Sequence, residues 1–211
     1  MNITGLLNAF DDLPAWKAFV AEIEKKRPLP PLHLPRSARP PVLAELFRTC
    51  RVPVVFIAGR IDNVGKWQQS LEAWLPDSET ILRFPEPTPL PYERGPWSDR
   101  SRLGRIQVLS HLMAGQHPQI PEAERPPLIL TSARALLQKS LPKRRFITTT
   151  RALRVGQILD LEKMLDDWSG IGYERASVVE AAGQFSQRGG IIDIFPAAAP
   201  YPVRIELFGN D

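Results

Sequence analysis

The stretch VPVVFIAG, residues 52–59, is the longest apolar run in the chain. Its apolar residues are continuous rather than alternating with polar ones, which is typical of a strand buried on both faces of a sheet. The segments on either side, PVLAELFRTC at 41–50 and VGKWQQSLEAWL at 64–75, have the apolar spacing of helices. A buried strand between two helices predicts an α/β fold.

The same alternation continues to about residue 141. Strands are expected at TILRF (80–84) and PLILT (127–131), and helices at 98–115 and 132–141. An amphipathic helix is also expected at 14–26, ahead of a proline-rich segment. Apolar strands alternating with helices predict a parallel sheet that is covered by helices on both faces.

The pattern changes near residue 145. A helix is expected at 158–172, followed by closely spaced short strands in the segments ERASVVE, GQFSQ, GGIIDIFP and PVRIELF. Short strands with tight connections favour antiparallel pairing, and therefore a second, smaller unit. We predict that residues 1–150 belong to the first domain and residues 151–211 to the second.

Composition limits the class of protein. The net charge of +4 allows contact with nucleic acid or an acidic protein without requiring it. A single cysteine excludes an internal disulfide. There is no secretory signal, and the longest apolar run is far short of the roughly 20 residues that span a bilayer. We expect a soluble, cytoplasmic and monomeric chain without a membrane segment.

The turn after the first buried strand, AGRIDNVGKW, is where an α/β protein would bind phosphate. It carries Gly59, Gly65 and Lys66, but five residues separate the glycines, and Trp67 stands where a P-loop has a magnesium-binding hydroxyl. We interpret it as a degenerate nucleotide loop without activity. The alternative is an unusual phosphate site.

Other candidate sites have a structural explanation. The carboxylates Asp160, Glu162, Asp166 and Asp167 are expected on the solvated face of a helix, so we predict no catalytic group and no metal site. The basic run at 143–154 could follow a phosphate backbone or could be a basic surface at a domain junction. Its members are Lys143, Arg144, Arg145, Arg151 and Arg154.

The closing strands place polar and apolar residues on opposite faces. A period of two puts Val203, Ile205 and Leu207 on the core face, and Arg204 and Phe208 on the other. The glycine pair at 189–190 predicts a bend or bulge that directs Arg188 to the same side. An arginine beside an exposed aromatic residue is typical of a protein interface. The alternative is that the arginines pair with Glu206 or Asp193.

The motifs RGGIIDIFP and YPVRIELFGND resemble a pattern shared by the excision-repair protein UvrB and the transcription-repair coupling factor (Mfd) family. Three further segments resemble coupling factors in particular: PTPLPYER, LILTSARALLQKSLP, and the stretch from Val155 to Phe185. The missing P-loop also favours that family over UvrB. The chain is therefore identified as similar to the UvrB-like N-terminal region of a coupling factor.

The resemblance implies a RecA-like domain, incomplete here, and a small mixed α/β domain that recruits UvrA through Arg188, Arg204 and Phe208. It also implies a longer protein, with an ATP- and magnesium-dependent DNA translocase that displaces stalled RNA polymerase, so that this chain is a fragment without a cofactor. Gln184 and Asn210 depart from the family pattern, in which acidic residues are common. A free-standing basic DNA-binding domain is the second hypothesis.

Overall fold

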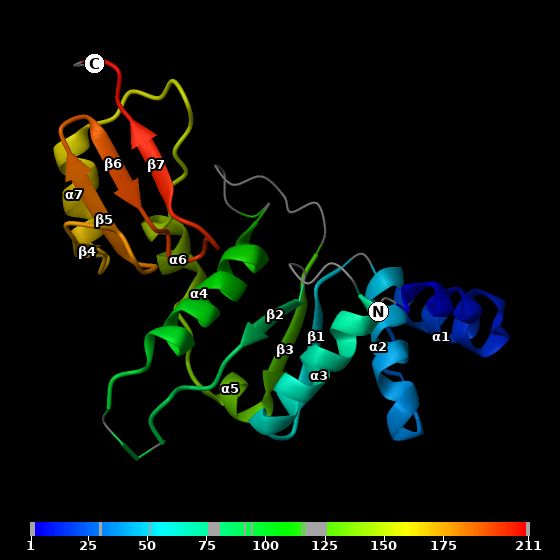
Figure 1. Cartoon of the computed structure of the whole chain (residues 1–211). Coiled ribbons are helices and arrows are strands. Elements are labelled where there is room, and N and C mark those ends of the chain that lie inside the picture. The colour runs from blue at the N-terminus through cyan, green and yellow to red at the C-terminus, as the bar shows by residue number, and fades with distance from the viewer. Residues whose placement is uncertain are drawn as a thin grey trace. The chain divides into compact units, whose positions relative to one another are not determined.

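The structure is a computed structural model that describes residues 3–29, 31–50, 52–75, 81–90, 92–93, 95–114, 116 and 126–209. The chain forms two compact units (Figure 1). The first contains residues 1–87 and 124–138, and the second contains residues 88–123 and 139–211. Compactness alone does not define a domain boundary within a family, so the division near residue 150 stays a prediction.

The first unit is built on a three-stranded sheet, here called sheet A. Its strands are β1 (Val54–Ala58), β2 (Ile81–Phe84) and β3 (Leu128–Ser132), in the order β1-β3-β2. Both strand pairs are parallel. The predicted α/β class and the parallel sheet are confirmed. β3 is buried along its whole length, as its central position requires.

Helical segments pack on one face of sheet A. The core there contains Leu43 and Ala44 of α2, Val64 and Leu71 of α3, and Leu128 of β3. The helical segments of this unit are η1 (Thr4–Asp12), α1 (Pro14–Glu24), η2 (Arg36–Ala38), α2 (Arg39–Thr49), α3 (Ile61–Trp74) and α5 (Ala133–Leu137).

The opposite side of β1 differs from the prediction. Val55 and Ile57 alternate with the core-facing residues of this strand, and both are exposed. Sheet A is therefore not covered by helices on both faces at β1, as far as the described residues go. The continuous apolar run could not reveal this, because it contains no polar residue to mark an open face.

Among the residues that the structure describes, the second unit contains three helices, α4 (Asp99–Met113), α6 (Lys143–Thr149) and α7 (Leu161–Gly170). Ser98 and Asp160 cap the N-termini of α4 and α7, and each side chain accepts a hydrogen bond from a backbone N–H of the first turn. Sequence analysis did not predict α6. None of the helices that the structure describes is long and apolar enough to cross a membrane.

Sheet B completes the second unit with β4 (Glu174–Arg175), β5 (Gln184–Arg188), β6 (Ile191–Ile194) and β7 (Val203–Glu206), in that order. The pairs β5–β6 and β6–β7 are antiparallel, as predicted. β4 is only two residues long and pairs with β5 in parallel, which differs from the prediction. The rest of the expected strand ERASVVE, residues 176–180, lies in a loop that runs to residue 183.

Candidate docking surface on the second sheet

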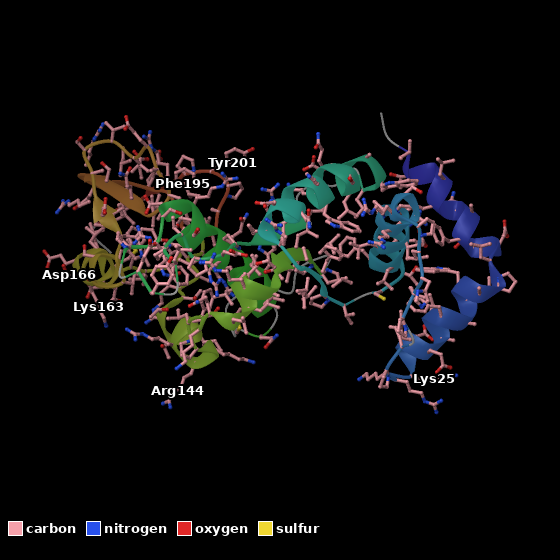
Figure 2. All side chains as sticks on the ribbon, turned by 90° about the horizontal axis from the view of Figure 1, so that it is seen from below. Lys25, Arg144, Lys163, Asp166, Phe195 and Tyr201 are labelled. Atoms are coloured by element: carbon pink, nitrogen blue, oxygen red, sulfur yellow. The ribbon has the colours of Figure 1, made fainter. Side chains whose placement is uncertain are left out.

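The core face of sheet B is covered by α7. Trp168 of α7 packs edge-on against Phe185 of β5, with ring centroids 5.6 Å apart, and Ile192 and Ile194 of β6 complete the buried cluster. The apolar residues predicted for α7 contribute to this cluster: Leu161, Met164, Leu165 and Trp168. Figure 2 shows Lys163 and Asp166 pointing away from the helix, which agrees with the predicted solvated face.

The outer face of sheet B brings the two predicted arginines together. Cross-strand register places Ser186, Asp193 and Arg204 in one row, and Arg188, Ile191 and Glu206 in the next. Since side chains alternate along each strand, both rows lie on the face opposite Phe185 and Ile192. Arg188 and Arg204 therefore share this outer face, on opposite sides of β6.

Arg204 forms an ion pair with Asp193, directly across the β6–β7 ladder. Its Nε and Nη2 donate to the two carboxylate oxygens, at 2.7 and 3.0 Å. These hydrogen bonds hold the pKa of Asp193 below its ordinary value and that of Arg204 above it. The positive charge of Arg188 also lowers the pKa of Asp193. The predicted alternative, pairing with Asp193, is confirmed for Arg204.

We expect Asp193 to titrate below a reference aspartate when its carboxyl carbon is followed by NMR, and the Arg204→Gln change to move this midpoint upward. Because the folded-state pKa lies below the unfolded one, the pair stabilises the fold above the ordinary aspartate range and loses its effect as pH falls through the lowered pKa. Arg188→Gln is the control and should cause a smaller upward shift. An unchanged midpoint in Arg204→Gln would contradict the ion pair.

The Gly189–Gly190 pair forms the two-residue turn of the β5–β6 hairpin rather than a bulge. Arg188 stays in register with Ile191, so normal strand alternation, and not a distorted backbone, directs it to the outer face. Gly189 has φ of 59°, which favours glycine. A Cβ on Gly190 would lie 3.3 Å from the Leu207 carbonyl oxygen, which leaves little room for a side chain.

Phe208 lies just beyond the end of β7 and is 87% exposed. The preceding residue extends the ladder by one bond, from Leu207 N–H to the Gly190 carbonyl at 2.8 Å. Leu207 and Ile205 pack against the core cluster, whereas Val203 is half exposed. The predicted core face is thus confirmed for Ile205 and Leu207 and is incomplete at Val203. Whether Phe208, Arg188 and Arg204 contact a partner stays a prediction.

The two departures from the family pattern have different outcomes. The Gln184 side-chain oxygen accepts hydrogen bonds from the backbone N–H groups of Glu180 and Ala181, both at 3.0 Å. A glutamate could accept the same bonds, so this departure preserves a local structural role. Asn210 lies outside the described residues.

The segment 59–67, predicted to be a degenerate nucleotide loop, is mostly helical. α3 begins at Ile61, so Gly65 and Lys66 lie within the helix, and only Gly59 and Arg60 connect it to β1. Trp67 packs against Phe56, with ring centroids 4.3 Å apart. The segment is therefore not a lengthened loop, as its glycine spacing suggested, but a short turn followed by a helix.

The basic run lies on α6 and the extended segment that follows it. All five basic residues are exposed. Lys143 donates to Gln116, and Arg151 folds back onto the Thr148 and Thr150 carbonyls. Figure 2 shows Arg144 directed away from the ribbon.

Relatives of known name match most of the chain. Over 175 residues it is 29% identical to the transcription-repair-coupling factor of Staphylococcus aureus USA300, and over 176 residues it is 29% identical to that of Bacillus subtilis 168. The chain is similar to transcription-repair coupling factors. Each alignment covers 83% of this chain and 14% of the relative, so the chain spans about a seventh of the length of these coupling factors.

The second sheet falls within a separate match. Residues 152–211 match the family model of the UvrB interaction domain. This range of the chain includes α7 and all of sheet B. The resemblance to the UvrB-like N-terminal region of coupling factors, predicted from the closing motifs, is confirmed.

Sequence reasoning missed the loop between β4 and β5. A strand was expected at 174–180, yet beyond Arg175 this segment belongs to a loop, residues 176–183, that is bound to β5 by side-chain hydrogen bonds. The alternation of Gln184, Ser186 and Arg188 on one strand face was visible in the sequence and could have indicated a polar surface that binds a loop.

Proposed function

We propose that the second unit of this chain recruits UvrA to nucleotide excision repair, as part of a transcription-repair coupling factor. One observation carries the proposal: the motif residues Arg188, Arg204 and Phe208 come from the segment that matches the UvrB interaction domain, and both arginines lie on the outer face of one sheet. An exposed aromatic residue beside arginines is typical of residues that dominate binding energy.

The charges on this face favour a protein partner over nucleic acid. Arg188 and Arg204 are balanced by Asp193 and Glu206 on the same rows of the sheet. A surface that binds the phosphate backbone needs an excess of positive charge, and its affinity falls steeply with salt. The basic run at 143–154 has such an excess, but no comparison favours the DNA-binding hypothesis.

The test is a titration of UvrA with the whole chain at moderate salt, beside a DNA mobility shift over a salt series. The proposal expects saturable UvrA binding that changes little with salt, because the docking face is charge-balanced. DNA binding that weakens strongly with salt, together with no UvrA binding, would favour a DNA-binding domain instead.

We further propose that this chain contains no catalytic group of its own. In our proposal the complete coupling factor is an ATP- and magnesium-dependent DNA translocase that displaces stalled RNA polymerase, through domains beyond this chain. The present chain, acting as a monomer, supplies the contact with the repair machinery.

We predict no measurable ATP binding or hydrolysis by this chain. Gly65 and Lys66 lie inside α3, where backbone N–H groups serve the helix and cannot form a phosphate cradle, and the Trp67 side chain has no hydroxyl oxygen to bind magnesium. Calorimetry with Mg-ATP and a phosphate-release assay check this. Micromolar binding, or turnover that is lost in Lys66→Ala, would show that the turn is a functional site.

A further inference from the structure

The loop 176–183 covers part of the outer face of β5, although Arg188 at the end of the strand stays exposed. Ser186 shows this most clearly: it points to the outer face by strand alternation, yet it is only 4% exposed. Its Oγ donates to the Ser177 carbonyl at 3.2 Å, and Arg188 Nη2 donates to the same oxygen at 2.7 Å. The loop and the strand thus form one continuous surface.

The third outer-face residue of β5 fixes the other end of the loop. Gln184 accepts from the N–H groups of Glu180 and Ala181, as described above. At the base of the loop, Ala176 N–H donates to the Phe185 carbonyl at 2.8 Å. Side chains from three alternate positions of one strand therefore attach the loop to the sheet at both of its ends.

The loop carries an apolar side chain, Val178, that is more than half exposed to solvent. Val178 follows the doubly accepting Ser177 carbonyl and is 57% exposed. A fixed loop that displays an apolar residue needs little ordering when a partner binds, so most of its contact energy appears as affinity. The sheet beside it carries Ile191, which is also exposed, in the row of Arg188.

We infer that the loop 176–183 is a second part of the docking surface, with Val178 as its apolar contact and Arg188 as the residue that positions it. The inference rests on the proposed function and extends it. The partner surface must offer an apolar side chain to Val178 and a neutral or mixed-charge surface to the Arg204–Asp193 ion pair. Arg188, already committed to the Ser177 carbonyl, acts at least in part through the loop.

The first test replaces Val178 by aspartate in the whole chain and measures UvrA affinity by titration and stability by a thermal melt. The expected result is affinity weaker by about tenfold or more, because an unpaired charge replaces the apolar contact, with an unchanged melting temperature. Val52→Asp is the matched control, since Val52 is also 57% exposed but belongs to the first unit. Equal affinities for the two variants would overturn the inference.

The second test separates positioning from direct contact. Gln184→Ala should speed amide hydrogen exchange at Glu180 and Ala181 and weaken UvrA binding, whereas Gln184→Glu keeps an acceptor and should restore both. Faster exchange with unchanged affinity would overturn the role of the loop. The proposed function fails separately, if the unaltered chain does not bind UvrA or if Phe208→Ala binds it as well as the unaltered chain does.

Discussion

Alanine in place of Phe208 should lower the affinity for UvrA by roughly 1 to 4 kcal/mol, which at the upper end removes most of the complex at micromolar concentration. The physical reason is area: a phenylalanine ring that is 87% exposed in the free chain has nearly all of its surface available to a partner. The same exposure means that the fold gains little from the ring, so stability should change by about 0.5 kcal/mol or less. UvrA titration and a thermal melt of each variant measure both quantities.

The matched control is Tyr92→Ala. Tyr92 is another strongly exposed aromatic residue, but it belongs to the segment between β2 and α4 and not to sheet B. If both variants lose affinity for UvrA, exposed aromatic side chains bind UvrA nonspecifically. Unaltered affinity in Phe208→Ala, together with intact folding, would remove Phe208 from the docking surface.

Arg204 requires a different experiment, because alanine there does two things at once. It removes a guanidinium from the surface, and it leaves the Asp193 carboxylate without its ion-pair partner. The comparison of Arg204→Ala with Asp193→Asn and the double variant separates the contact with the partner from the pairing within the sheet.

Much of the candidate site could be predicted because strand alternation is a strong constraint. Once residues 202–208 are assigned to a strand, the period of two places Arg204 and Ile205 on different faces of the sheet. The register between β6 and β7 then places Asp193 beside Arg204, directly across the ladder. The four apolar positions of α7 were equally clear, since a helix with a single apolar stripe has only one way to pack.

The remaining features depend on contacts that a sequence pattern does not contain. ERASVVE has the β-branched residues of a strand, but side chains of β5 bind residues 177–181 as a loop, and tertiary hydrogen bonds override the local preference. Gly59 and Gly65 suggested a loop, although Gly65 lies in α3 with the Arg83 side chain 3.7 Å from where a Cβ would stand. A glycine shows only that a bend is allowed there, not that one is present.

Alanine in place of Phe185 is expected to produce the largest loss of stability, about 3 to 5 kcal/mol. Phe185 is 1% exposed and packs edge-on against Trp168, which is also buried, so its removal leaves a cavity between β5 and α7. A domain has only about 5 to 15 kcal/mol of net stability, so the second unit should be partly unfolded under mild denaturant. Urea unfolding followed through the methyl NMR signals of Ile192 and Ile194 measures this unit specifically.

Phe208→Ala is the control for this prediction as well, because it makes the same chemical change at an exposed residue just beyond the end of β7. If the two substitutions cost equal stability, the assignment of the two faces is wrong. UvrA affinity then completes the comparison, since Phe185→Ala should reduce binding only in proportion to the unfolded fraction, and Phe208→Ala should reduce it with folding intact. The two phenylalanines thus separate what sheet B needs to fold from what it offers to a partner.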